Sequence, residues 1–293
     1  MTGNSGRSLI AACVQMRAGK VASRNVDQVA LLAKQAADDG ATYVQTPEMT
    51  NILVRSREDL FAAILPEEAD PSLAAFQELA RALKITLHLG SLAIRLEGDR
   101  AANRAFVIDP EGDIVARYDK IHMFDVDLPD GESWRESATY RPGEQAVVAQ
   151  MPWGGLGLTI CYDVRFPTLH RALAEHGADV IASPAAFTKK TGEAHWHVLL
   201  RARAVETGSF VVAAAQGGVH EDGRETYGHS LIIDPWGRVL AEGGVEPGVV
   251  LAEIDLAKVA DIRQRIPSLE NGRRFAVSPA PAEPTTLLRD VAL

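Results

Sequence analysis

Short apolar runs alternate with amphipathic segments along most of the chain, and this alternation most restricts the folds it can adopt. Runs of strand length occur at 9–16, 41–45 and 85–94, whereas apolar residues recur at helical spacing in 23–39 and 72–83. Strands that are separated by helices are typical of parallel pairing in an α/β protein. The sequence therefore predicts sheets that are covered by helices.

The second half of the chain repeats this order. It predicts strands at 145–151, 156–160, 179–183 and 209–215, and helices at 168–176 and 194–207.

Two tetrapeptides with the pattern D-P-x-G, at 109–112 and 234–237, interrupt the alternation. Each separates two short apolar runs, which is typical of a tight antiparallel hairpin. Because a purely parallel sheet has no such hairpins, the expected fold class is a layered α/β fold with mixed sheets. We interpret the two tetrapeptides as repeated turn chemistry and not as a sequence repeat.

No linker-like stretch divides the 293 residues, so we expect a single domain, 1–293, with its core at about 8–274. The proline- and alanine-rich segment 278–293 predicts a C-terminal arm. A net charge of −9 disfavours a general nucleic-acid-binding surface. The N-terminal apolar run is too short for a membrane span and lacks a signal-cleavage pattern. We therefore expect no nucleic-acid or membrane partner.

Two cysteines are too few for a disulfide framework, which fits a reducing, cytoplasmic compartment. Cys13 lies inside an apolar run and is predicted to be structural. Cys161 lies between a predicted strand and a predicted helix, where backbone N–H groups can face a developing anion. From this local pattern alone, an activated nucleophile and a buried structural thiol both remain open.

A nucleophilic thiol needs a base, and no histidine has a spacing that points to Cys161. His195 and His197 are two residues apart on a predicted helix, so their side chains diverge and a zinc site is disfavoured. His229 in YGHS is predicted to be structural. The sequence contains neither a GxGxxG fingerprint nor a P-loop, so we expect no cofactor and no metal. Glu48 and Lys120 each follow a predicted strand, although each alone is typical of an exposed side chain.

The motifs TPEMT, YDKIHMFDVD and LTICYDVRFP occur in an order that resembles the nitrilase (carbon–nitrogen hydrolase) superfamily over about residues 8–274. The segments AHWHVLLRARAVET, FVVAAAQGG and YGHSLIIDPWGRVL are most similar to its Nit branch. The resemblance implies an α-β-β-α sandwich that forms homodimers or higher homo-oligomers through a sandwich face.

The resemblance also implies a catalytic triad of Glu48, Lys120 and Cys161. Glu48 is then the base, provided that its surroundings raise its pKa. Lys120 and the backbone N–H of Tyr162 are then the groups that hold the oxyanion.

Three further residues have roles that the resemblance leaves open. An accessory glutamate corresponds to Glu136 in WRES, with Glu144 in RPGE as the competing candidate. Arg165 is the predicted anchor for a substrate carboxylate, and an internal ion pair with Asp163 is its alternative role.

As a Nit-like amidase, the chain is expected to hydrolyse the amide C–N bond of a small carboxylated 2-oxo acid through a cysteine thioester and to release ammonia. Deaminated glutathione is the favoured substrate, and 2-oxoglutaramate, the substrate of ω-amidase, is the alternative. Acidic residues in the loop 123–140 favour the shorter substrate; they are Asp125, Asp127, Asp130 and Glu132. Nitrile or N-carbamoyl hydrolysis is less favoured, and the intact triad argues against a non-catalytic binding protein.

Overall fold

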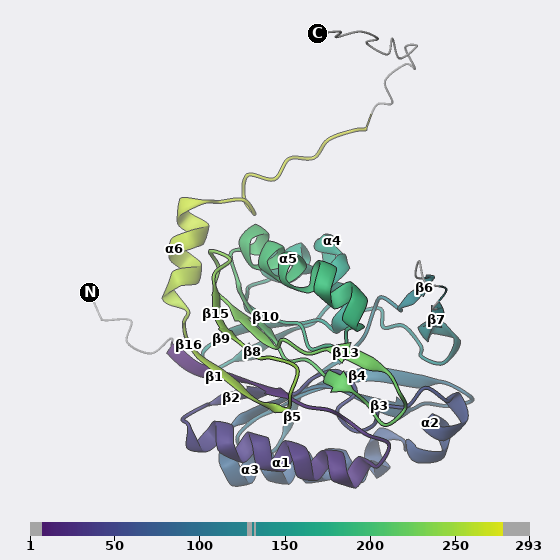
Figure 1. Cartoon of the computed structure of the whole chain (residues 1–293). Coiled ribbons are helices and arrows are strands. Elements are labelled where there is room, and N and C mark those ends of the chain that lie inside the picture. The colour runs from purple at the N-terminus through teal and green to yellow at the C-terminus, as the bar shows by residue number, and fades with distance from the viewer. Residues whose placement is uncertain (1–7, 128–130, 132, 278–293) are drawn as a thin grey trace, which may run out of the picture.

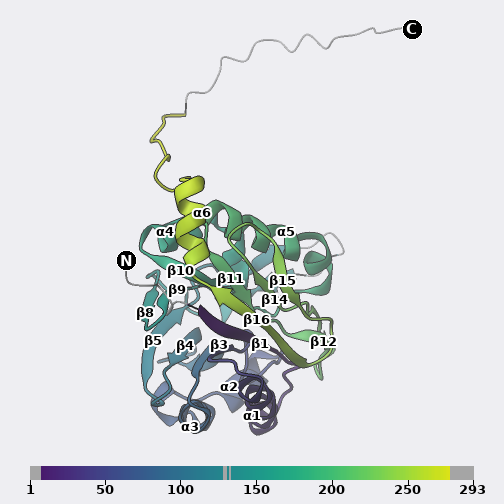
Figure 2. The same cartoon turned by 90° about the vertical axis from the view of Figure 1, so that its left-hand side faces the viewer.

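Two six-stranded mixed sheets lie between two layers of helices in the computed structural model, which describes residues 8–127, 131 and 133–277 (Figure 1, Figure 2). The predicted arm at 278–293 lies outside the described residues. The layers therefore follow the order helix, sheet, sheet, helix, as expected for the α-β-β-α sandwich.

The first sheet has the strand order β16-β1-β2-β3-β4-β5. Its members are β1 (Ser8–Gln15), β2 (Tyr43–Gln45), β3 (Thr86–Arg95), β4 (Ala101–Ile108), β5 (Ile114–Asp119) and β16 (Gly248–Asp255). The pairs β1–β2 and β2–β3 are parallel, and the other pairs are antiparallel. The sequence reading missed β16, which pairs with β1 over all eight residues.

The second sheet has the order β15-β14-β11-β10-β9-β8. Its members are β8 (Val148–Met151), β9 (Gly154–Leu158), β10 (Ala178–Ala182), β11 (Phe210–Ala213), β14 (Leu231–Ile233) and β15 (Val239–Glu242). From β15 to β8 the pairings run antiparallel, antiparallel, parallel, parallel and antiparallel. The first sheet shows the same succession from β5 to β16, so the two sheets share one pairing plan.

The two D-P-x-G turns close the edge hairpins of the two sheets, β4–β5 and β14–β15. Asp109 Oδ1 accepts hydrogen bonds from the N–H groups two and four residues later, and Asp234 Oδ1 does the same. Gly112 and Gly237 have φ angles of 84° and 81°, a region that glycine enters without steric cost. The predicted hairpins are thus present, and their turns use the same chemistry.

Two long helices cover each sheet on its outer face (Figure 1). The first sheet is covered by α1 (Ala22–Asp38) and α3 (Pro71–Leu83), and the second by α4 (Pro167–Glu175) and α5 (Lys189–Thr207). The helix α5 begins at Lys189, whereas the sequence predicts a start at 194. The prediction starts too late because the first turn of the helix contains few apolar residues and carries no amphipathic signal. The sequence reading also missed α2 (Arg57–Ala63) and α6 (Ala257–Arg265).

The remaining elements are short. They are the strand pairs β6 (Asp125–Asp127) with β7 (Ser133–Arg135) and β12 (Gly217–Val219) with β13 (Glu225–Tyr227), and the 3-10 turns η1 (Glu67–Ala69), η2 (Glu136–Ala138) and η3 (Cys161–Arg165).

The core fills both faces of the central strands. In β1, Ala11 and Cys13 pack toward the second sheet, whereas Ala12 and Val14 pack in the cluster that contains α1 and α3. Burial on two faces explains why this strand is a continuous apolar run. Burial also raises the pKa of the Cys13 thiol to about 12, in keeping with a structural residue. Within the described residues, none of the helices is both long enough and apolar enough to cross a membrane.

Candidate active site

Glu48 is presented by a tight turn that directly follows β2. Thr50 Oγ1 donates a hydrogen bond to Pro47 O at 2.7 Å, which closes the turn. Gly90 lies against this turn, and a Cβ atom at that position would be 2.2 Å from Thr46 O. The absence of a side chain on Gly90 therefore allows the turn to lie against β3 and fixes the direction of the Glu48 side chain.

Lys120 follows β5 and is buried between two carboxylates. Its Nζ atom lies 2.9 Å from Glu48 Oε1 and 3.0 and 2.9 Å from the two oxygens of Glu136. Asn103 Nδ2 donates to Glu48 at 2.9 Å and to Glu136 at 3.1 Å. One lysine and one amide thus hold the two carboxylates in a fixed relation.

Of the two accessory-glutamate candidates, the structure brings Glu136 to Lys120 and leaves Glu144 on the surface. Glu136 Oε2 also accepts a hydrogen bond of 2.7 Å from Phe124 N. Its carboxylate is therefore fixed from two sides before any substrate is present.

Cys161 is the first residue of η3, three positions after the last residue of β9. Its φ angle is 49°, in the left-handed region that residues other than glycine rarely adopt. The backbone N–H donates to Pro184 O at 2.8 Å, and the negative charge of Glu48 acts on the thiol. Unfavourable backbone angles of this kind are concentrated at functional sites, where surrounding contacts maintain them.

The electrostatics of this cluster decide which groups are charged. Burial and the negative charge of Glu48 raise the pKa of Cys161 well above its ordinary value. Burial alone would lower the pKa of Lys120, but the charges of Glu136 and Glu48 outweigh it and raise that pKa. The resting site therefore holds a neutral thiol and a charged lysine.

The expectation that the surroundings of Glu48 raise its pKa is wrong. Burial does act in that direction, but the charge of Lys120 and the hydrogen bonds from Lys120, Asn103 and Cys161 outweigh it and lower the pKa. Glu48 is therefore an ionised carboxylate close enough to the thiol for the two groups to shift each other's pKa, and in this form it can accept a proton.

Asp163 holds the turn that carries the thiol. Its buried carboxylate accepts hydrogen bonds from Ile160 N at 2.8 Å, Tyr118 OH at 2.7 Å and His122 Nδ1 at 2.7 Å. These contacts join η3 to the strand that leads to the lysine. The sequence left open an ion pair between Asp163 and Arg165. In the structure, the carboxylate of Asp163 bonds instead to Ile160, Tyr118 and His122.

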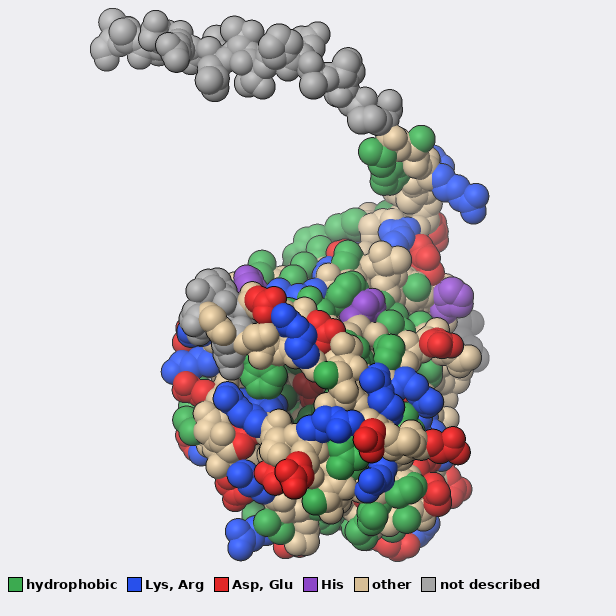
Figure 3. Space-filling view, turned by 90° about the vertical axis from the view of Figure 1, so that its right-hand side faces the viewer, with side chains coloured by type: hydrophobic (Ala, Val, Ile, Leu, Met, Phe, Trp, Pro, Cys, Tyr) green, Lys and Arg blue, Asp and Glu red, His purple; other side chains and the backbone are tan. Residues whose placement is uncertain are grey.

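A cavity of about 400 Å³ opens above these groups. Figure 3 shows a hollow on this face of the molecule, with lysine and arginine side chains around it. The cavity is lined by residues from both halves of the chain, among them Glu48, Lys120, Glu136, Cys161, Tyr162 and Phe187. None of the eight histidines, all of which lie in the described ranges, is part of this lining.

One wall of the cavity is a tryptophan with two arginines. The guanidinium carbon of Arg224 lies 4.7 Å from the centroid of the Trp134 ring, and that of Arg55 lies 5.5 Å from it. The Arg224 side chain is only 15% exposed, and burial lowers its pKa. Its Nε atom is buried and makes no hydrogen bond within the described part of the chain. Nη2 of Arg224 lies 3.7 Å from Asp222 Oδ2. Arg224 and Arg55 both line the cavity, where a guanidinium can bind a carboxylate.

Arg165 lies behind a different wall. Its guanidinium carbon is 5.4 Å from the Phe187 ring centroid and 5.9 Å from that of Tyr162, and both rings line the cavity. One of its nitrogens is 3.2 Å from His195 Nδ1. Arg165 itself is outside the lining of the cavity, so its role as a carboxylate anchor stays a prediction.

The sequence reading missed several residues of this site. Asn103 had a usable signal, since it is a polar residue within the apolar strand β4. Arg224 and Trp134 had none, because both lie in polar segments whose approach to the cavity depends on the tertiary fold.

The comparisons with known proteins agree with this geometry. The family model described as carbon-nitrogen hydrolase matches residues 10–264. Deaminated glutathione amidase of Synechocystis sp. is 41% identical over 89% of this chain and 97% of that protein. Human omega-amidase NIT2 is 35% identical over 89% of this chain and 94% of that protein. Saccharomyces cerevisiae Nit3, of branch 10 of the nitrilase superfamily, superposes with a TM-score of 0.82 at 29% identity, over 92% and 97% of the two chains.

The mixed sandwich and the match over most of its length define the class of the protein as a hydrolase of carbon–nitrogen bonds. The chain belongs to the carbon–nitrogen hydrolase family. The resemblance to the Nit branch of the nitrilase superfamily is confirmed.

Proposed function

We propose that this protein is an amidase that releases ammonia from a small carboxylated 2-oxo acid amide, with deaminated glutathione favoured over 2-oxoglutaramate. The convergence of Cys161, Glu48 and Lys120 on one cavity, with the Lys120 ammonium 2.9 Å from the Glu48 carboxylate, is the main support. The similarity to deaminated glutathione amidases favours the longer substrate.

In the proposed reaction, Glu48 accepts the thiol proton while Cys161 Sγ forms a bond to the amide carbon. The carbonyl oxygen becomes an oxyanion, which Lys120 Nζ and the Tyr162 backbone N–H stabilise. Glu48 then transfers its proton to the amide nitrogen, the C–N bond breaks, and ammonia leaves a thioester on Cys161.

The second half of the reaction uses the same carboxylate. Glu48 removes a proton from water, and the hydroxide adds to the thioester carbon. The tetrahedral species collapses, the C–S bond breaks, and the thiolate regains a proton from Glu48 as the acid product leaves. Glu136 positions Lys120 throughout, since both of its oxygens contact Nζ.

The wall of the cavity that contains Trp134, Arg55 and Arg224 suits a substrate with a carboxylate far from the reacting amide. Arg224 lines the cavity, with its Nη2 atom 3.7 Å from Asp222 Oδ2 and 3.4 Å from Val54 O, and Arg55 adds a second positive charge over the same ring. Asp127 is exposed and paired with Arg135, and Asp125 accepts hydrogen bonds from Ser137. These pairings weaken the argument that acidic loop residues repel a long substrate.

The experiment is a comparison of kcat/KM for deaminated glutathione, 2-oxoglutaramate and a neutral amide of similar length. The proposal predicts the highest value for deaminated glutathione. Arg224→Lys is expected to reduce kcat/KM for the carboxylated amides and to spare the neutral amide, because the planar fork is lost. Arg165→Lys, measured in parallel, tests the anchor expected from the sequence. A clear preference for 2-oxoglutaramate would transfer the assignment to ω-amidase.

The proposed enzyme is one domain, cytoplasmic, and works as a homodimer that pairs through the outer face of α5. Val198 and Val205 on this helix are 61% and 54% exposed, and Trp236 in the adjoining turn is 57% exposed. Exposed apolar side chains that cluster on one face mark interaction surfaces. The cytoplasmic setting is supported by two free, buried cysteines.

A further inference from the structure

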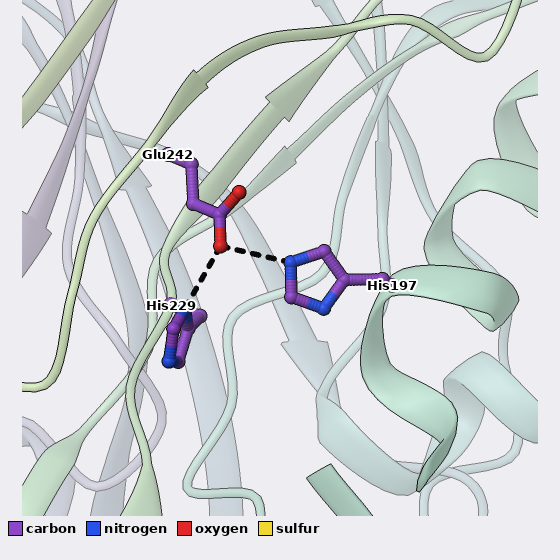
Figure 4. Close-up of side chains that lie close together, drawn as sticks. All are labelled: His197, His229 and Glu242. Atoms are coloured by element: carbon purple, nitrogen blue, oxygen red, sulfur yellow. Dashed lines mark hydrogen bonds and ion pairs between the residues drawn. The ribbon is translucent and has the colours of Figure 1, made fainter. Parts of the chain in front are cut away.

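His197, His229 and Glu242 meet on the outer side of the second sheet, away from the cysteine cavity. The three residues come from α5, from the segment between β13 and β14, and from the end of β15 (Figure 4). Glu242 Oε1 lies 2.9 Å from His197 Nε2 and 2.8 Å from His229 Nδ1. The potential ligand atoms all lie within 4.8 Å of one another.

The position of His229 is fixed by its backbone. Its φ angle is 52°, its N–H donates to Gly244 O at 2.7 Å, and its carbonyl accepts from Trp196 Nε1 at 2.8 Å. Its ring stacks on Tyr227, with the ring centroids 4.4 Å apart. A strained backbone that is held from both sides presents the imidazole in one direction without any ligand.

Glu242 supplies the negative charge of the cluster. Its Oε1 atom accepts hydrogen bonds from both imidazoles, so one carboxylate oxygen faces both rings. All three side chains remain partly exposed, so an ion can reach them from solvent.

We propose that His197 Nε2, His229 Nδ1 and the Glu242 carboxylate form a binding site for a divalent transition metal, with Zn²⁺ the best match. Two imidazoles and one carboxylate are a donor set that zinc uses in proteins, with water in the fourth position. Zn²⁺ bonds of ~2.0–2.2 Å in a tetrahedron place ligand atoms about 3.3 Å apart. The ligand atoms now lie 2.8 Å or 2.9 Å from Glu242 Oε1 and within 4.8 Å of one another, so small side-chain rotations bring them to the spacing that Zn²⁺ requires.

Metal binding replaces the two hydrogen bonds to Glu242. A coordinated ring nitrogen carries no proton, so each imidazole turns a lone pair toward the ion instead of an N–H group. The bound ion would join α5 to β15 and to the segment before β14. The site shares no residue with the cysteine cavity, so this proposal does not depend on the proposed function.

The test is calorimetric titration of the full chain, free of any affinity tag and of metal, with Zn²⁺ near neutral pH. Every sample carries Cys161→Ala, so that the catalytic thiol contributes no ligand. The parent is expected to bind one Zn²⁺ per chain. His197→Ala and His229→Asn are each expected to weaken binding at least ~10-fold, since even outer-shell changes at metal sites cost that much.

Two choices keep the result interpretable. His195→Ala is the matched control, because His195 lies two positions before His197 on the same helix and outside the cluster. This variant is expected to bind Zn²⁺ like the parent. Asparagine is used at 229 because it tolerates a positive φ. The visible absorption of bound Co²⁺ is expected to be as strong in His195→Ala as in the parent, and weaker in His197→Ala and His229→Asn. Equal affinity in the parent, His197→Ala and His229→Asn would overturn the proposal, as would no saturable binding by the parent.

Discussion

Lys120 Nζ lies 2.9 Å from Glu48 Oε1, and the two side chains are only 2% and 6% exposed. Opposite charges this close and this far from water stabilise each other strongly. Glu48 therefore stays ionised although burial opposes it, and the adjacent thiol stays protonated. The pair keeps ionised the carboxylate that we propose as the base in place of a histidine.

The charge of Lys120 sets the acid limit of activity. In the native site the pKa of Glu48 is lowered, so the base is lost only below the ordinary glutamate range. In Lys120→Met, burial remains without the compensating charge, so that pKa rises and the acid limb of kcat/KM moves to higher pH. The pH profile for a neutral amide, measured on the residual activity, checks this. An acid limb at the same pH in both proteins would contradict it.

Substitutions of Glu48 and Lys120 are expected to reduce turnover for different reasons. Glu48→Gln keeps the shape but cannot accept the thiol proton, so we expect turnover to be abolished. Lys120→Met removes a donor to the oxyanion, which typically costs ~10²–10³ in kcat. Lys189→Met, at an exposed lysine that pairs with Glu225, is the control and should retain activity. Near-native kcat in either folded site variant would remove that residue from the mechanism.

Asp163 is expected to matter for stability. Asp163→Asn places an NH2 group in the position of one carboxylate oxygen, where it faces either the donors Ile160 N and Tyr118 OH or the donor His122 Nδ1. Leaving such buried groups unsatisfied costs about 1–3 kcal/mol. Urea unfolding should therefore show a lower free energy of unfolding. A value unchanged within error would show that the turn does not depend on this carboxylate.

The α5 face is expected to hold the dimer together. A buried, unpaired charge is costly, so Val205→Glu should shift the protein toward monomer in light scattering coupled to size-exclusion chromatography. Leu31→Glu, at an exposed position on α1, is the matched control and should leave the mass unchanged. Identical masses for Val205→Glu and the native protein would place the interface elsewhere.

Local patterns were sufficient for the elements whose apolar spacing reflects burial. Strand β1 is apolar from Leu9 to Val14 because both of its faces are covered, and the turn at 234–237 is recognisable because Asp234 and Gly237 have fixed roles in it. The helix α5 begins in residues without amphipathic spacing, so its start was placed too late.

The site was less accessible to local reasoning. Glu48, Lys120 and Cys161 were named from their resemblance to family motifs, and only the fold brings their side chains together. The direction of the Glu48 pKa shift depends on a lysine 72 residues away, which sequence spacing does not reveal. The same holds for His197 and Glu242, whose contact depends on how α5 packs beside β15.

The central claim is that Cys161 carries the acyl group during turnover. The most direct measurement is intact-mass analysis, with peptide mapping, of the enzyme quenched in acid while it hydrolyses deaminated glutathione. The mechanism predicts a mass increase equal to the substrate minus ammonia, located on the peptide that contains Cys161 and absent in Cys161→Ala. Cys13→Ala should show the same adduct and the native kcat. An adduct on Cys13 in place of Cys161, or turnover that persists in Cys161→Ala, would contradict the mechanism.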